Sequence, residues 1–390
     1  MRVLVLGGGY AGVVAVSRLE RRLPDDVELL LVDERESHLI RHELHRVIRR
    51  PAFADTIQIP FDRIPGRAEH VRGTVTGIET EKSRVTVAGE GVLDYDAALL
   101  SFGAGPAYYD LDGVEANSIP LDSPEDALDI GTRMEDLLVA GEGRVVIGGG
   151  GLAGIQAAGE LAALREQWGD TDVAISLLEQ APRLAPQFEN GFEGRLQAAL
   201  EELCVEVRTG SEVVSATEDS VALAGGSSLD ADLFVWTGGI TGRPATSGQR
   251  PQVRADLRLD ETTFAAGDAV SVIDVDGSHA PPSAQTAIRQ AKVASTNIEK
   301  TVSARRTGET FRPRYDRYRD ESFAWVVSVG DTTMAKIGPQ VVSGQAAKAI
   351  KSTVGVGYLS SAGAIREALD IAREEFGFPV PSLESMPSEA

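Results

Sequence analysis

The feature that most constrains the fold of this chain is a glycine-rich segment that occurs twice, 142 residues apart. Residues 2–12 read RVLVLGGGYAG, and residues 144–154 read RVVIGGGGLAG. Each copy opens with a short apolar run, which is typical of a parallel β-strand covered on both faces. Because an internal repeat of this kind marks two copies of one supersecondary unit, we expect the chain to contain two related domains.

The glycines of each copy have the G-x-G-x-x-G spacing of a phosphate-binding turn between a strand and a helix. They are Gly7, Gly9 and Gly12 in the first copy, and Gly149, Gly151 and Gly154 in the second. The first glycine allows a tight turn, the second lets the backbone approach a pyrophosphate, and the third lets the helix pack closely on the strand. Tyr10, Ala11, Leu152 and Ala153 lie inside the motifs, and helices are expected over residues 13–22 and 155–167, with their N-termini toward the anion.

An acidic residue ends the second apolar run of each copy. Asp33 follows residues 27–32, with Glu34 next to it, and Glu179 follows residues 173–178. A carboxylate at this place can accept a hydrogen bond from a ribose hydroxyl of the dinucleotide. Glu179 would also repel the 2′-phosphate of NADP, so the second site is predicted to bind NAD rather than NADP.

The ends of other strands supply further candidates, because a doubly wound sheet holds its ligands at the carboxyl ends of its strands. The candidates are Val75, in the first of the short strands expected over residues 74–100, and then Ser101, Phe102, Gly103, Thr237, Gly238, Gly267 and Asp268. Asp268 follows a glycine at a strand end, where a carboxylate can reach a ribityl hydroxyl.

The charge of the chain bears on its partners. Its 390 residues include 38 basic and 59 acidic side chains, a net charge of −21, which argues against nucleic acid as a partner. Only six basic residues are lysine, and this composition favours adaptation to high salt over an ordinary acidic cytosolic protein. We find no secretory h-region and no apolar run that could span a bilayer, so we predict a cytoplasmic protein, soluble or peripheral to the membrane.

Cysteine and histidine give little support to a metal site. Cys204 is the single cysteine, which excludes a disulfide or a cysteine cluster and is expected to be a buried structural thiol. His38, His42 and His45 could mark a metal site, but no cluster of acidic or thiol ligands elsewhere supports one. An amphipathic helix with a basic side is the simpler interpretation, and we predict no metal.

Two dinucleotide folds in one chain are needed when one nucleotide delivers a hydride to another that stays bound, as in a pyridine-nucleotide-dependent flavoenzyme. FAD is predicted in the N-terminal site, since the first glycine motif and Gly267–Asp268 come from both ends of the chain and can enclose it, and NADH in the repeat. The predicted fold is α/β, with two Rossmann-like domains, the NAD domain inserted in the FAD domain, and a small C-terminal α+β region. The boundaries are 1–112 and 261–320 for FAD, 113–260 for NADH, and 321–390 for the C-terminal hairpin and helices.

These motifs resemble those of the two-dinucleotide-binding-domain flavoproteins, which are pyridine nucleotide-disulfide oxidoreductase-like. Within them the chain is most similar to the type II NADH:quinone oxidoreductases, also called alternative NADH dehydrogenases. The matching segments are residues 7–12, 32–38, 57–60, 145–161, 179–186, 235–238, 266–268 and 284–287. The resemblance implies a non-proton-pumping enzyme that oxidises NADH with FAD and reduces a quinone, with Gln285 against the isoalloxazine as the acceptor-side catalytic residue. A peripheral contact with the membrane and a homodimer are compatible with it.

The chain departs from the family pattern at three places. A glutamate usual after the second glycine motif is Gln156, and a glutamine usual four residues after Gln285 is Arg289, with Gln290 next to it. Residues 341–363 are small and mixed, whereas membrane-binding helices of the family are rich in tryptophan and leucine. These departures leave two alternatives open: a soluble NADH-dependent reductase of a ferredoxin or other small acceptor, and an NADH-sensing flavin-binding protein.

Overall fold

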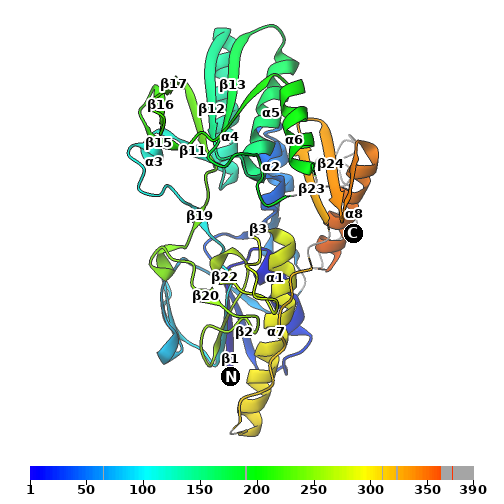
Figure 1. Ribbon diagram of the computed structural model, residues 1–390. Coiled ribbons are helices and arrows are strands. Elements are labelled where there is room, and N and C mark those ends of the chain that lie inside the picture. The colour runs from blue at the N-terminus through cyan, green and yellow to red at the C-terminus, as the bar shows by residue number, and fades with distance from the viewer. Residues whose placement is uncertain (65, 189–190, 310, 322–323, 362–370, 372–390) are drawn as a thin grey trace, which may run out of the picture.

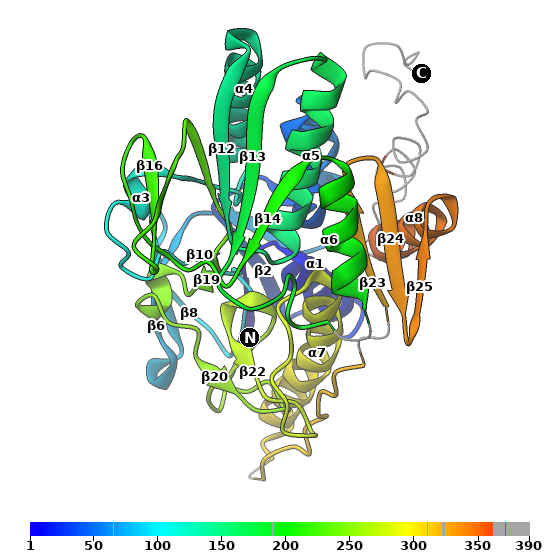
Figure 2. The ribbon, with the colours of Figure 1, turned by 45° about the horizontal axis from the view of Figure 1, so that its top comes forward.

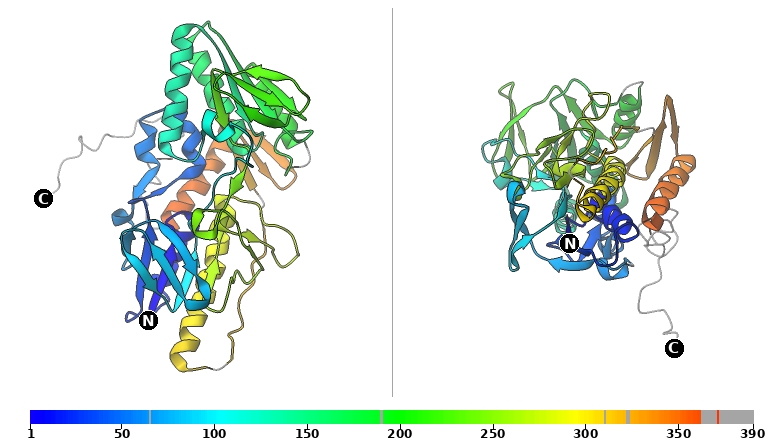
Figure 3. Two further views of the ribbon diagram at one scale, coloured as in Figure 1. Left: turned by 90° about the vertical axis from the view of Figure 1, so that its left-hand side faces the viewer. Right: turned by 90° about the horizontal axis from the view of Figure 1, so that it is seen from below.

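The computed structural model describes residues 1–64, 66–188, 191–309, 311–321, 324–361 and 371. Two parallel sheets of the same design form two domains toward opposite ends of the molecule (Figures 1 and 3). The sheet of the N-terminal domain has the strand order β5–β2–β1–β9–β21, and all neighbours are parallel. Its strands are β1 (Arg2–Leu6), β2 (Glu28–Asp33), β5 (Glu69–Arg72), β9 (Ala97–Leu100) and β21 (Thr263–Ala265).

The sheet of the inserted domain repeats this order as β14–β13–β12–β18, with β11 at its edge. Its strands are β12 (Glu142–Gly148), β13 (Asp172–Glu179), β14 (Val205–Thr209), β18 (Leu233–Trp236) and β11 (Ile119–Pro120). Each domain also carries a three-stranded antiparallel sheet in the corresponding place. These strands are β6 (Val75–Glu79), β7 (Arg84–Val87) and β8 (Gly91–Asp94), and β15 (Val213–Ala216), β16 (Ser220–Leu223) and β17 (Ser228–Asp230). The predicted pair of Rossmann-like domains is therefore confirmed.

Burial on both faces explains the apolar run Val145–Ile147 in β12 of the inserted domain. Val145 and Ile147 of β12 pack into the main core, while Val146 between them faces the antiparallel sheet. Three helices share the main-core face, namely α4 (Pro124–Ala140), α5 (Leu152–Trp168) and α6 (Phe192–Glu202). Figure 2 shows α5 and α6 beside β12, β13 and β14.

Two helices of the N-terminal domain pack against each other, α1 (Tyr10–Glu20) and α7 (Ala284–Thr307). Both α1 and α5 begin three residues before the predicted starts at 13 and 155, directly after the second glycine of each motif. The sequence also predicts a helix that begins after the prolines at 281 and 282 and reaches about Thr301; α7 begins at Ala284 and continues six residues further, to Thr307.

A small C-terminal module packs on both domains. It consists of β23 (Ala324–Val329), β24 (Thr332–Ile337), β25 (Gln340–Ser343) and α8 (Gln345–Ser361). In this C-terminal region the sequence predicts a hairpin around Gly330–Asp331 and a helix over residues 346–351. The hairpin is confirmed, and the helix, α8, is longer than predicted. A Cβ on Gly159 of α5 would lie 2.5 Å from the Gly330 nitrogen, so this glycine permits close approach of α5 to the hairpin. The sequence also predicts a helix over residues 364–375, which fall almost wholly outside the described residues.

The segment after β2 does not form the predicted amphipathic helix with a basic side, so this prediction is wrong. It forms β3 (Ser37–Leu39) and a 3₁₀ helix, η1 (Arg41–Ile48), in which His45 and Arg46 are buried. Its basic side chains are used in internal ion pairs, since Arg46 pairs with Glu43 and Arg49 with Glu160.

Short elements connect these parts. They are α2 (Phe53–Thr56), β4 (Gln58–Pro60), η2 (Phe61–Arg63), η3 (Thr80–Lys82), β10 (Gly105–Pro106), α3 (Val114–Asn117), β19 (Ile240–Thr241), η4 (Pro244–Thr246), β20 (Gln252–Val253), η5 (Gly267–Ala269) and β22 (Ser271–Val272). The chain crosses between the two domains at β10 and β19, which pair with each other.

The prediction that Cys204 is a buried thiol is wrong, because this residue is exposed in a turn with φ of +54°. Among the described residues, none of the helices combines the length and apolarity that crossing a bilayer requires.

Candidate dinucleotide-binding sites

The first and third glycines of each motif are required by the packing of the protein itself. A Cβ on Gly12 would lie 1.8 Å from the Gly7 carbonyl oxygen, and a Cβ on Gly154 would lie 2.0 Å from that of Gly149. Gly7 and Gly149 have φ near +106°, where residues with a side chain are strained. These four glycines hold each helix close to its strand, as the sequence predicts.

The second glycine of each motif lies in open space. A Cβ on Gly9 would have its nearest described neighbour at 3.9 Å, and one on Gly151 would meet none within 4 Å. Both residues have φ near −72°, which any residue can adopt. The fold itself therefore does not require these two glycines, and a site for a bound phosphate group does require them.

The N-termini of α1 and α5 are free to bind an anion. Gly9 and Gly151 are their N-caps, with no side-chain hydrogen bond to the helix and no acidic residue in the first turn. In contrast, Ser123 caps α4 and Ser283 caps α7. Two helices of the same chain thus have capping side chains, while the two that follow the glycine turns have no capping side chain on their first N–H groups.

The acid of each motif holds the glycine turn. Asp33 accepts hydrogen bonds from the nitrogens of Gly8 (2.6 Å) and Arg35 (2.8 Å). Glu179 accepts from the nitrogens of Gly150 (2.8 Å) and Ala181 (2.7 Å). A carboxylate has about four acceptor positions, so each acid can hold the turn and still accept from a ribose hydroxyl.

Ser101 and Thr237 have a role that the sequence analysis missed. The Ser101 hydroxyl lies 3.0 Å from the carbonyl oxygen of Gly7, and the Thr237 hydroxyl lies 2.9 Å from that of Gly149. Their equivalent places after β9 and β18 were the signal for this shared role. Each turn is thus held by an acid from one neighbouring strand and a hydroxyl from the other.

The second part of the N-terminal domain closes on the first glycine motif, as predicted. A Cβ on Gly267 would lie 3.3 Å from Cβ of Ala287 and 3.6 Å from Cβ of Ala11, so β21, α7 and α1 meet here. The Gly267 nitrogen donates to Gln290 Oε1 at 2.7 Å, which assigns this buried glutamine a role in shaping the turn.

Asp268 has the chemistry expected of a ligand-binding acid. Burial raises the pKa of its carboxyl group, against the influence of Arg250 and Arg41. The part of the chain that the structure describes supplies no hydrogen bond to this carboxylate, although Arg250 binds the Asp268 main-chain oxygen at 2.7 Å. A half-buried carboxylate without protein donors fits a ligand that brings its own hydroxyl groups.

Four further residues that the sequence analysis named lie in different parts of the structure. Gln285, in the first turn of α7, is half-buried and makes no hydrogen bond to described residues. Gln156 points to the C-terminal hairpin, where its Oε1 lies 3.5 Å from the Ser328 nitrogen. Val75 is a half-buried residue of β6 that packs against the main core. Glu34 lies 3.1 Å from the Thr74 hydroxyl.

Phe102, Gly103 and Gly238 lie in the turns after β9 and β18. The Phe102 backbone comes within 2.3 Å of a Cβ built on Gly7, and Gly103 has φ of +71° with open space around it. Gly238 accepts a 3.3 Å hydrogen bond from Tyr109. The described residues contain no group of three or more His, Cys, Asp or Glu side chains that could hold a metal ion.

This architecture defines a class of protein. The chain belongs to the pyridine nucleotide-disulphide oxidoreductase family, whose model matches residues 1–291. Among its relatives is the type II NADH:quinone oxidoreductase of Staphylococcus epidermidis (strain ATCC 12228 / FDA PCI 1200), 25% identical over 337 residues that cover 78% of this chain and 84% of that protein.

Solved structures share the fold. NDH2 from Plasmodium falciparum, in complex with NADH, superposes with a TM-score of 0.79 at 13% identity, covering 97% of this chain and 99% of that one. The sulfide:quinone oxidoreductase of Aquifex aeolicus gives a TM-score of 0.75 at 17% identity, covering 98% and 93%. The family resemblance identified from the sequence motifs is thereby confirmed.

Proposed function

We propose that this protein is an FAD-dependent NADH dehydrogenase that passes electrons to a quinone. The observation that carries the proposal is the pair of glycine turns, each with an open position at its second glycine beside an uncapped helix N-terminus. The N-terminal turn is also faced by Gly267 and Asp268, which suits a nucleotide that stays bound. We assign the nucleotide that exchanges to the inserted turn.

The proposed reaction is NADH + H⁺ + quinone → NAD⁺ + quinol. FAD, when bound, accepts a hydride and releases electrons singly or in pairs, so no side-chain nucleophile is required. The residues of the chain bind and orient: α1 and α5 face the two diphosphates, while Asp33 and Glu179 accept from the riboses. Since the relatives named above include type II NADH:quinone oxidoreductases, a quinone is the acceptor we favour.

Quinones with long tails reside in the bilayer, so the proposed activity places the enzyme at the cytoplasmic face of a membrane as a peripheral protein. The homodimer stays a prediction. Gln285 is the residue that we assign to the acceptor, because small neighbours at the start of α7 leave room for a planar ring and its amide can donate to a quinone carbonyl.

Glu179 is expected to set the preference for NADH over NADPH. Glu179→Gln should lower the ratio of kcat/KM for NADH to kcat/KM for NADPH by about tenfold or more. The reason is that the amide neither repels a 2′-phosphate nor offers a charged acceptor to the 2′-hydroxyl. Steady-state kinetics with both nucleotides measure the ratio, and Glu202→Gln, a change of an exposed acid on α6, is the control. Equal turnover of both nucleotides by the wild type would contradict the assignment.

Gln285→Leu tests the acceptor. The variant should slow reoxidation by a short-chain quinone about tenfold while reduction by NADH proceeds at the wild-type rate, because the two substrates use opposite faces of the flavin. Stopped-flow absorbance separates the two half-reactions, which steady-state rates do not. Gln167→Leu, at the exposed end of α5, is the control.

Three other outcomes are informative. If a ferredoxin reoxidises the wild type rapidly and a quinone does so no faster than oxygen, the protein is a soluble reductase. If NADH does not bleach the flavin, a sensing role replaces turnover. A purified protein that neither carries nor takes up FAD would overturn the proposal as a whole.

A further inference from the structure

A chain of hydrogen bonds joins the C-terminal helix α8 to the glycine turn of the predicted FAD site. His38 Nδ1 lies 2.9 Å from the carbonyl oxygen of Gly8, and His38 Nε2 lies 2.8 Å from the hydroxyl of Tyr358. Both side chains are buried, with exposed fractions of 1% for His38 and 8% for Tyr358. The contact spans 320 residues of sequence and therefore depends on how α8 is docked.

Chemistry fixes the direction of these hydrogen bonds. A carbonyl oxygen only accepts, so His38 Nδ1 must carry the proton and donate to Gly8. Burial lowers the pKa of His38 to about 4, so the ring is neutral and its Nε2 has a free lone pair. Tyr358 then donates to Nε2. The Gly8 nitrogen, on the other side of the same residue, donates to Asp33, so this turn residue is held at both its polar atoms.

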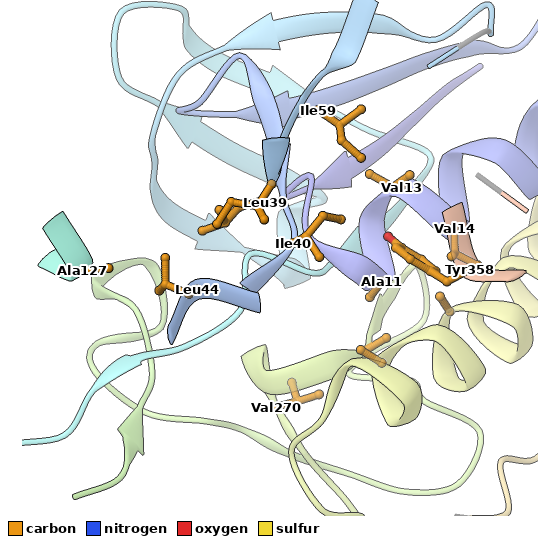
Figure 4. Packing of buried hydrophobic residues seen from close by; sticks show 14 of the residues in the cluster. Ala11, Val13, Val14, Leu39, Ile40, Leu44, Ile59, Ala127, Val270 and Tyr358 are labelled. Atoms are coloured by element: carbon orange, nitrogen blue, oxygen red, sulfur yellow. The ribbon is translucent and has the colours of Figure 1, made fainter. Parts of the chain in front are cut away.

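The first residue of α1 completes the contact. The ring of Tyr10 lies 5.2 Å from the ring of Tyr358 and 5.2 Å from that of His38. Figure 4 shows Tyr358 at the start of α1, near Ala11 and Val14. Helix α8 therefore contacts Tyr10 directly, at the helix N-terminus that would face the diphosphate, and reaches the glycine turn through His38.

A second polar contact holds the same face of α8. Lys351 lies two helical turns before Tyr358, and its Nζ is 3.0 Å from Oε2 of the buried Glu43. Arg46 Nη1 lies 3.0 Å from the same oxygen. Burial alone would raise the pKa of Glu43, but Lys351 and Arg46 hold it well below its usual range, so the acid is charged. Ala347, one turn before Lys351 on this face, is fully buried.

We propose that docking of α8 and binding of FAD stabilise each other through the contacts Tyr358–His38–Gly8 and Lys351–Glu43. Tyr358, His38 and Lys351 are then positioning residues for the glycine turn. The inference rests on the proposed FAD site. Coupling between two equilibria is reciprocal. If docking of α8 raises the affinity for FAD by some factor, binding of FAD must favour the docked state of α8 by the same factor.

The test uses the full-length FAD-loaded protein and its variant Tyr358→Phe. We expect FAD to dissociate about two- to tenfold faster from the variant, the effect of one lost hydrogen bond, followed by the rise in flavin fluorescence. His38→Asn should behave alike, because its amide nitrogen can replace Nδ1 as the donor to Gly8, whereas the shorter side chain has no acceptor at the position where Nε2 accepts from Tyr358. Tyr315→Phe is the matched control, since it removes a 3.0 Å hydrogen bond to Thr301 in the same domain.

A second measurement distinguishes coupling from a general loss of stability. In the wild type, amide hydrogen exchange over residues 345–361 should be slower at saturating FAD than at limiting FAD. In Tyr358→Phe the ratio of these two exchange rates should be smaller, by the same factor by which the variant loses affinity for FAD. The proposal is overturned if FAD leaves α8 exchange unchanged, or if Tyr358→Phe releases FAD no faster than Tyr315→Phe. A protein that binds no FAD at all would instead contradict the proposed function.

Discussion

Gly9→Ala is expected to bind FAD about five- to a hundredfold more weakly while the protein without FAD unfolds at the wild-type temperature. The added methyl group meets no described atom closer than 3.9 Å, and φ of −72° suits alanine, so the fold accepts it. The methyl group would occupy the place where the backbone must approach a pyrophosphate, and an intruding carbon in a packed site costs about 1–3 kcal/mol. Titration of FAD by fluorescence and a thermal melt measure the two effects.

Gly151→Ala is the matched control in the other domain. It should weaken NADH binding by a similar factor and leave FAD in place, because a Cβ there also meets no neighbour within 4 Å. Gly12→Ala provides the contrast, since its Cβ would lie 1.8 Å from the Gly7 carbonyl oxygen and should lower the melting temperature of the protein itself. If Gly9→Ala keeps wild-type affinity for FAD, the N-terminal turn does not hold the diphosphate.

Local patterns allowed much of this fold to be predicted. The repeated strand and glycine turn identified both Rossmann-like sheets, and equivalent spacing placed Asp33 and Glu179 at corresponding strand ends. These features depend on short-range geometry, which a sequence motif encodes directly. The starts of α1 and α5 were predicted three residues late, because a glycine N-cap has no side chain to mark the first turn.

Contacts between distant segments could not be predicted. The pattern of residues 38–50 predicted an amphipathic helix with a basic side, because nothing local to these residues indicates that Lys351 and Tyr358 lie against them. Likewise, the hydroxyl of Ser101 was assigned to a ligand, whereas it also binds the glycine turn of another strand. In both cases the partner is set by tertiary packing, to which a single sequence gives no direct access.

One buried ion pair joins all three parts of the molecule. Arg49, after η1, lies 2.6 Å from Glu160 of α5 and 2.7 Å from Asp331 of the C-terminal hairpin. The side chains of Arg49 and Glu160 are each 3% exposed. A buried ion pair therefore lies between the two dinucleotide domains, and Asp331, whose side chain is 70% exposed, extends it to the C-terminal hairpin.

Arg49→Met is expected to destabilise the protein by about 3–5 kcal/mol, because it leaves Glu160 buried without its cation. The double variant Arg49→Met/Glu160→Gln should recover most of this loss, since the remaining amide carries no charge. Urea unfolding measures the free energies. Arg133→Met is the control, because it removes an exposed pair with Asp129 at 3.2 Å and should cost less than about 1 kcal/mol.

The destabilisation by Arg49→Met should also depend on pH. Burial raises the pKa of Glu160 even in the wild type, where Arg49 opposes the shift, so the variant should raise it further. A carboxyl group whose pKa is higher in the folded than in the unfolded protein favours folding at low pH and loses that contribution as the pH rises. The difference in stability between wild type and variant should therefore be smaller at pH 5 than at pH 8. A difference that is the same at both values would mean that Glu160 finds another cation after Arg49 is removed.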